Sequence, residues 1–221
     1  MNYFSHYAID HIQHNHDYNT GLLLPDITKK KIRTFKLTEN SQTVPNHFQQ
    51  LHLGCLQHYL SDKIFHSSDF FQKHAELLNY KLKNSGLSNF AERKWFISHV
   101  MLELLIDRVI IKEDIYLLDD FYHSLNKVDE NNLRQFLHYF GIENSDEFFV
   151  FFNHFRSVQY IYHYTDNKKF MYSLNRIMLR AGLNELNIID NNILEGILVD
   201  FEQTYFNNSN ELLNNLKSIF N

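Results

Sequence analysis

The chain has 221 residues, of which 44% are hydrophobic and 21% are charged, and its formal net charge at pH 7 is −5. This length and hydrophobic content are enough to bury a core, so we expect a folded protein and not a disordered one. The negative net charge argues against general nucleic-acid binding, which relies on clustered positive charge, and no apolar run is long enough to predict a membrane span.

The single cysteine, Cys55, cannot form an internal disulfide, and the amino terminus lacks the basic and then apolar pattern of a secretion signal. We therefore predict a cytoplasmic location. Six glycines and two prolines leave long segments with helical periodicity. We predict an all-α fold: a single-domain helical bundle over residues 1–221, with 181–221 as candidate appended carboxy-terminal helices.

In chain order, the first predicted helix covers about Asn2–His14. A short one follows around Gly21–Asp26, where Pro25 limits its extension. After a polar stretch at Leu37–Asn46, Pro45 is well placed to start a helix that runs to about His66. Ser67 or Ser68 then caps the next helix, which should end at Gly86.

Ser88 or Asn89 opens a long predicted helix that runs to about Lys112, with Trp95 on its broad apolar side. Beyond a break at Asn207–Asn210 we expect a last helix. Between these two segments the predicted helices are Ile115–Leu125, Asn131–Phe140, Asp146–His154, Asn167–Arg180 and Asn191–Phe206. The aromatic cluster between Phe148 and Tyr164 is interpreted as core, with a pantetheine groove or a homodimer face as the alternative.

Two segments have potential metal ligands four residues apart, which places each trio on one face of a helix. These trios are His58, Asp62 and His66, and then His99, Glu103 and Asp107. His6, Asp10 and His14 have the same spacing, and about one such trio is expected by chance in a chain of this composition. The simpler interpretation of each pair is a surface contact worth a few tenths of a kcal/mol, so the apolar context of the long helix is what favours a site.

At this point the residues resemble a known family. Met1–His6, Gly21–Asp26 and the Gly54-x3-His58-x3-Asp62 motif are similar to segments of the acyl carrier protein phosphodiesterase family. Val100-x2-Glu103-x3-Asp107 occupies the place of that family's paired-aspartate helix. The segment from Tyr164 through Leu174 and Asn175 to Arg180 has the spacing of a later family motif.

The resemblance implies a helical fold related to the metal-dependent His-Asp phosphohydrolases. It also implies a reaction, the hydrolysis of the phosphodiester that joins 4′-phosphopantetheine to a serine of acyl carrier protein. Manganese is the expected cofactor, as one or two ions; mixed histidine and carboxylate ligands also suit iron or zinc. The candidate metal ligands are His6, Asp26, His58, Asp62, His66, His99, Glu103 and Asp107.

Asp62 and Asp107 are the candidate catalytic carboxylates, which bridge metal or orient water. The chain departs from the family pattern at Tyr59, which replaces Arg, at His66, which replaces Asp, at Leu22, which replaces Asn, and at Arg108, which replaces His. His66 keeps a ligand, whereas a guanidinium cannot coordinate a cation. We therefore assign Arg108 a candidate catalytic role in pairing with phosphate oxygens.

One basic run lies in the otherwise acidic chain, and we expect it to steer an acidic carrier protein to the site. The run comprises Lys29, Lys30, Lys31, Arg33 and Lys36. The alternative for this run is a solvated loop or helix face. For the whole chain, the alternatives are a phosphohydrolase that acts on a nucleotide or other small phosphoester, and a non-catalytic helical protein that binds the carrier. A ferritin-type di-iron site is disfavoured because no Glu-x-x-His motif occurs.

Overall fold

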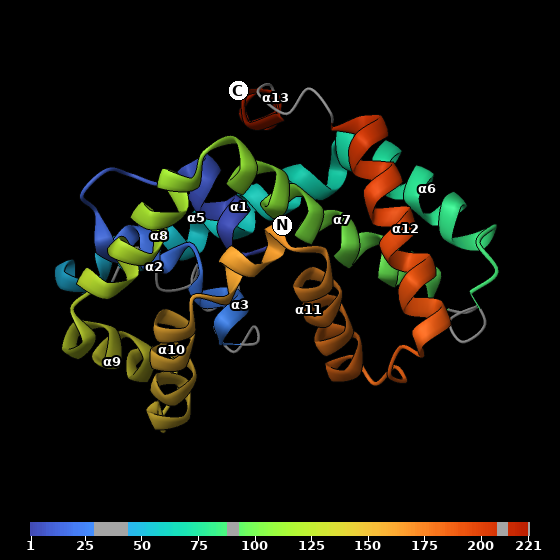
Figure 1. The fold of residues 1–221 in the computed structure, drawn as a ribbon. Helices are drawn as coiled ribbons and strands as arrows, with labels where there is room; N and C mark the ends of the chain where they lie inside the picture. The colour runs from blue at the N-terminus through green and yellow to red at the C-terminus, as the bar shows by residue number, and fades with distance from the viewer. Residues whose placement is uncertain (29–43, 88–92, 207–211, 221) are drawn as a thin grey trace. The chain divides into compact units, whose positions relative to one another are not determined.

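A computed structural model describes residues 1–28, 44–87, 93–206 and 212–220 (Figure 1). All regular structure in these ranges is helical and none is strand, so the predicted all-α fold is confirmed. Within the same ranges, every helix is too short or too polar to cross a bilayer.

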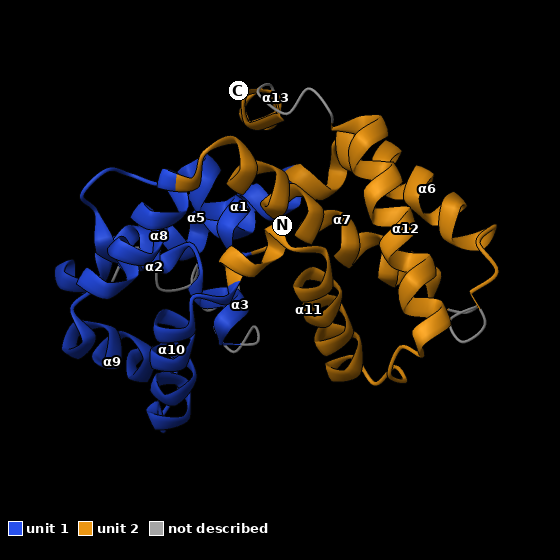
Figure 2. Cartoon of the chain, viewed as in Figure 1, with its two compact units in different colours: residues 1, 3–64, 116–160 blue, residues 2, 65–115, 161–221 orange. Residues whose placement is uncertain are grey.

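The contacts divide the chain into two compact units, shown in blue and orange in Figure 2. Unit 1 comprises residues 1, 3–64 and 116–160, and unit 2 comprises residues 2, 65–115 and 161–221. Each unit is therefore assembled from stretches that are far apart in sequence. The prediction of a single domain over 1–221 stays a prediction.

Unit 1 contains short helices near the amino terminus, most of one long helix and three helices from the middle of the chain. They are α1 (Tyr3–Asp10), α2 (His16–Gly21), α3 (Leu24–Ile27), η1 (Asn46–Phe48), α5 (Gln49–Ser67), α8 (Ile115–Lys127), α9 (Glu130–Tyr139) and α10 (Asp146–Val158). Aromatic side chains form its core: Phe4 and Tyr7 of α1 meet Phe121 of α8 edge to face, and Phe121 in turn contacts Phe155 of α10. Phe149, Phe152 and Phe155 are all buried, in agreement with the core interpretation of this aromatic segment.

The first helix ends at Asp10, four residues earlier than predicted. The side chain of Asn19 forms hydrogen bonds with both backbone groups of Ile12. It accepts from the N–H at 2.9 Å and donates to the carbonyl at 3.0 Å. His14 then adopts a left-handed φ of 62°, and Asn15 caps α2 by accepting from the N–H of Tyr18. The predicted short helix around Gly21–Asp26 is in fact two, because α2 ends at Gly21 and α3 holds Pro25 in its first turn.

Helices α2 and α5 approach each other closely through two glycines. A Cβ atom on Gly54 would lie 2.1 Å from the carbonyl oxygen of Tyr18, and one on Gly21 would lie 2.3 Å from that of Leu51. Only glycine fits at such a backbone contact. The contact holds the end of α2, and hence Leu22, against α5.

Unit 2 is built around one long helix. Its elements are α6 (Asp69–Lys83), α7 (Lys94–Glu113), η2 (Tyr160–Thr165), α11 (Asn167–Arg180), α12 (Ile188–Tyr205) and α13 (Leu212–Ile219). Helix α7 contacts α6, α11, α12 and α13, which explains why it is buried on most sides from Met101 to Ile111. Helix α12 also contacts α6 and α11, so this part of residues 181–221 packs within unit 2, and its prediction as an appended segment stays a prediction.

The predicted helix ends in unit 2 follow the expected chemistry. Ser68 caps α6 by accepting from the N–H of Phe71, and α6 ends just before Gly86, whose φ is 74°. The predicted start of the long helix at Ser88 or Asn89 lies outside the described residues, as does the predicted break at Asn207–Asn210. Trp95 is 48% exposed, so it does not belong to the apolar side of α7 as predicted.

Candidate metal centre

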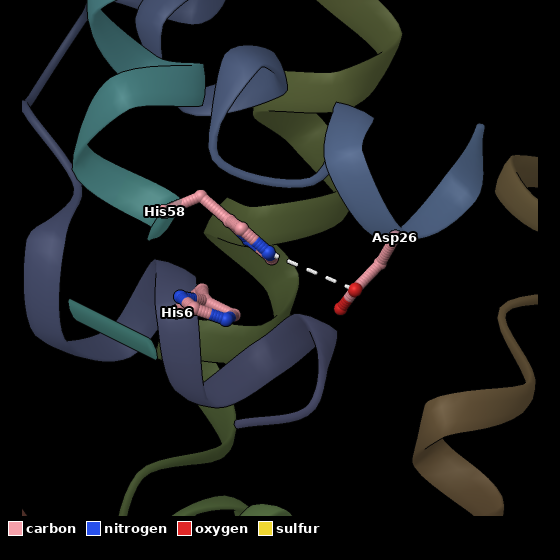
Figure 3. A group of neighbouring side chains, drawn as sticks. All are labelled: His6, Asp26 and His58. Atoms are coloured by element: carbon pink, nitrogen blue, oxygen red, sulfur yellow. Dashed lines mark ion pairs between the residues drawn. The ribbon is translucent and has the colours of Figure 1, made fainter. Parts of the chain in front are cut away.

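Three elements of unit 1 bring His6 of α1, Asp26 of α3 and His58 of α5 together (Figure 3). Each residue offers one ligand atom, and these atoms lie within 4.8 Å of one another. Asp62 lies one turn after His58 on α5, and its Oδ1 is 3.6 Å from Nε2 of His6. The structure thus gathers three of the predicted metal ligands, with a fourth, Asp62, beside His6.

His58 is oriented by a backbone contact. Its Nδ1 lies 2.8 Å from the carbonyl oxygen of Leu22, so Nδ1 donates a hydrogen bond to that oxygen and Nε2 is the ring nitrogen on the side of Asp26. Nε2 is 3.7 Å from Oδ1 of Asp26 (Figure 3). An N–H to carbonyl bond behind the ring is the usual support for a metal-binding histidine.

His6 is fully buried, and neither of its ring nitrogens makes a hydrogen bond. The ring stacks on that of His58 with centroids 4.0 Å apart. Burial lowers the pKa of His6 to about 4, and the neighbouring His58 acts in the same direction, so the ring is neutral at pH 7. A neutral imidazole is the form that binds metal.

Asp62 accepts a hydrogen bond of 2.5 Å from the amino group of Met1. Burial alone would raise the pKa of Asp62, but the adjacent His6 and the positive amino group outweigh it and hold the pKa well below its usual range. The carboxylate is therefore ionised at neutral pH. The Asp26 and Asp62 side chains are 24% and 26% exposed, whereas both histidine rings are buried, so the cluster is open to solvent on its acidic side.

These residues fit a divalent cation. Ligand atoms about 2.1 Å from a shared ion lie roughly 3.0–3.4 Å from each other, close to the 3.6 and 3.7 Å measured between the histidine and carboxylate pairs. Those distances are too long for direct hydrogen bonds. The two unbonded nitrogens of His6 are the strongest sign of a missing ligand, because a buried polar atom without a partner costs about 1–3 kcal/mol.

A second group of predicted ligands assembles in unit 2. Nε2 of His66, in the last turn of α5, and Nε2 of His99, on α7, lie 2.9 and 3.0 Å from the same oxygen of Glu103. Burial raises the pKa of Glu103, but nearby positive charge and these two hydrogen bonds outweigh it and lower the pKa well below its usual value. All three residues of this cluster lie in unit 2.

Asp107 belongs to neither cluster. It is buried in unit 2, where its Oδ2 accepts a 2.6 Å hydrogen bond from the side-chain amide of Asn2. No pattern in the sequence indicated that Asn2 would be a partner of Asp107. Its catalytic role stays a prediction.

Arg108 is also buried, and the structure gives its guanidinium protein partners instead of leaving it open to phosphate. Nε donates to Glu202 at 2.9 Å, Nη1 to the carbonyl of Tyr164 at 3.0 Å and Nη2 to Asn167 at 2.7 Å. Arg108 therefore joins α7, η2, α11 and α12, and we do not carry its predicted contact with phosphate oxygens forward.

The predicted carrier-binding run, Lys29, Lys30, Lys31, Arg33 and Lys36, lies outside the described residues. Cys55 is buried in unit 1, and burial raises the pKa of its thiol, so it is not an activated nucleophile. The comparisons add no assignment, since no family model, curated protein or solved structure matches this chain.

Proposed function

We propose that this chain is a metal-dependent phosphodiesterase whose metal ligands are His6, Asp26, His58 and Asp62. The observation that carries the proposal is His6, a fully buried neutral histidine with two unbonded nitrogens beside a second histidine and two carboxylates. Two imidazoles with carboxylates suit manganese, iron or zinc. A divalent ion in such a site neutralises charge on a phosphoryl group and makes water a better nucleophile.

The protein groups have distinct tasks in this proposal. Leu22 holds the His58 ring through its carbonyl, and the stack with His6 fixes the second ring. Asp62, with its pKa well below the usual range, is a weak base, so it suits metal binding or a hydrogen bond that orients the attacking water, and not proton removal. The exposed edges of Asp26 and Asp62 provide the side from which a phosphodiester enters.

For the substrate we propose holo-acyl carrier protein, with hydrolysis that leaves the serine hydroxyl on the carrier and releases 4′-phosphopantetheine. This choice depends on the resemblance of the Gly21–Asp26 and Gly54–Asp62 segments to the phosphodiesterase family. A cytoplasmic location is part of the same proposal.

The test is to incubate the purified chain and manganese with holo-carrier and to measure the intact mass of the carrier. We expect the carrier mass to fall by the mass of phosphopantetheine less one water, because hydrolysis returns a hydroxyl to the serine. His6→Asn should abolish the reaction and the metal bound at the unit 1 site. His154→Asn is the matched control, because His154 is exposed on α10 and belongs to neither cluster.

Three outcomes would overturn the proposal in different ways. Turnover of a nucleotide or other small phosphoester with the carrier unchanged would replace the substrate and keep the site. Tight binding of the carrier without turnover would favour a non-catalytic binding protein. Equal metal content in His6→Asn and the wild type would show that no metal binds at the unit 1 cluster.

A further inference from the structure

We propose that His66, His99 and Glu103 form a separate binding site in unit 2 for a divalent cation of the zinc class. The site does not depend on the proposed phosphodiesterase activity, and all three of its ligands lie in unit 2.

The two histidines converge on one point. Their Nε2 atoms lie 2.9 and 3.0 Å from the same Glu103 oxygen, and the ring centroids are 4.8 Å apart. Three ligands around a tetrahedral ion with bonds of about 2.0–2.1 Å would be about 3.3 Å apart. The two histidine–carboxylate distances therefore need to lengthen by only a few tenths of an ångström to match those of a coordination shell.

The ligands are held by rigid elements. His99 and Glu103 are one turn apart on the 20-residue helix α7, and His66 lies in the last turn of α5. Phe71 of α6 contacts both histidine rings with its own ring, at centroid distances of 4.8 Å in each case. The rings are thus positioned before any ion arrives, which lowers the entropy cost of binding.

The site is accessible. The side chains of His66 and His99 are 29% and 32% exposed and that of Glu103 is 16% exposed, so an ion can enter and water can complete its shell. A neutral imidazole can move its proton to Nδ1, which frees Nε2 to bind metal. Two imidazoles and one carboxylate are ligands that zinc, cobalt, nickel and iron bind well and that magnesium and calcium do not prefer.

The experiment measures bound zinc in the full chain. The protein is stripped with a chelator, dialysed against Zn²⁺ and analysed for metal, and the same titration with Co²⁺ is followed by visible absorbance. We expect His99→Asn and His66→Asn each to lose one equivalent of zinc, or more than about tenfold in affinity for it. His6→Asn should keep that equivalent, and His154→Asn should bind as the wild type does.

The readouts separate this site from the unit 1 cluster and from misfolding. Each metal-free variant is melted by circular dichroism, and added zinc should raise the melting temperature of the wild type but raise it less in His99→Asn. One equivalent that is lost in His99→Asn and kept in His6→Asn supports the unit 2 site even if the phosphodiesterase proposal fails. Equal zinc binding by the wild type, His66→Asn and His99→Asn would overturn it.

Discussion

At the scale of single residues, the burial of His6 opposes the protonation of its ring. The folded state holds the ring buried and lowers its pKa from 6.5 to about 4, whereas an unfolded chain would protonate it near 6.5. Between these two pH values the unfolded state binds more protons, so acid favours unfolding. The stability that the neutral ring retains at pH 7 is therefore lost as the pH falls from 6.5 towards 4.

We expect the metal-free protein to lose about 2 kcal/mol of unfolding free energy through His6 when the pH falls from about 7 to about 5. Urea unfolding of the wild type and His6→Asn, both in chelator, measures the difference. The variant should lose less stability over this range, because it has no titrating group at position 6. Identical pH dependence in the two proteins would contradict the burial of His6.

Arg108 illustrates a substitution whose sequence-based interpretation and structural role differ. Its three hydrogen-bonded partners lie on different elements of unit 2, and the partner Glu202 also pairs with Lys112 at 2.5 Å. Removal of a buried guanidinium leaves the carboxylate, carbonyl and amide oxygens that it bonded without a hydrogen-bond donor.

We expect Arg108→Met to lower the free energy of unfolding by about 2–4 kcal/mol, measured by urea denaturation. Lys81→Met is the matched control in the same unit, because the Lys81 to Asp200 pair is exposed and should be worth less than about 1 kcal/mol. Metal binding at the unit 1 cluster should not change in Arg108→Met. A loss of that metal with unchanged stability would return Arg108 to the site.

The candidate site could be predicted only in part from the sequence. Spacing and resemblance selected His6, Asp26, His58 and Asp62, and the structure brings these together. The support for His58 could not be found this way, because Leu22 contributes a backbone carbonyl that any residue possesses. For the same reason, the departure from the family residue at position 22 leaves this contact intact.

At the scale of the helices, caps and apolar periodicity were sufficient to place most elements, and Asn167–Arg180 has the predicted bounds. Periodicity failed where a side chain competed with the helix, as Asn19 does at Ile12. The apolar periodicity before Ile12 does not predict a hydrogen bond to a side chain seven residues later. The separation of the ligands into two clusters was likewise not predictable, because i to i+4 spacing defines a face and not its neighbour.

The contact between α2 and α5 gives a prediction at this scale. We expect Gly54→Ala to lower the free energy of unfolding by about 1–3 kcal/mol or more, because its Cβ would meet the rigid backbone oxygen of Tyr18 at 2.1 Å. The resulting shift of α2 should also move Leu22 from His58 and weaken metal binding by His6 and its neighbours. Thermal melts and metal analysis measure the two effects.

Gly196→Ala is the control for this substitution. Gly196 lies in helix α12, where an added Cβ meets nothing within 4 Å. Alanine has the higher helix propensity, so this change should stabilise by up to about 1 kcal/mol. Equal effects of the two substitutions would show that helix propensity, and not the contact between α2 and α5, determines the result.

At the scale of the whole molecule, the two units are interleaved along the chain, since unit 2 takes residues 65–115 and then 161–221. Its late segment supplies α12, which buries Leu194, Leu198 and Phe201 in unit 2 and provides Glu202 to Arg108. The carboxy-terminal stretch is thus required by a helix, α7, that the chain completes about eighty residues earlier.

We therefore expect a chain that ends at Leu183 to lose cooperative unfolding of unit 2. Exposure of three large apolar side chains costs roughly 5–9 kcal/mol, comparable to the full stability of a domain. A chain that ends at Phe206 keeps α12 and loses only α13, so it should retain a cooperative melt. Circular dichroism and size-exclusion chromatography compare the two. If the free energy of unfolding of the shorter chain lies within about 2 kcal/mol of that of the full chain, α12 is an appendage. A helix that completes the core of unit 2 could not be removed at so small a cost.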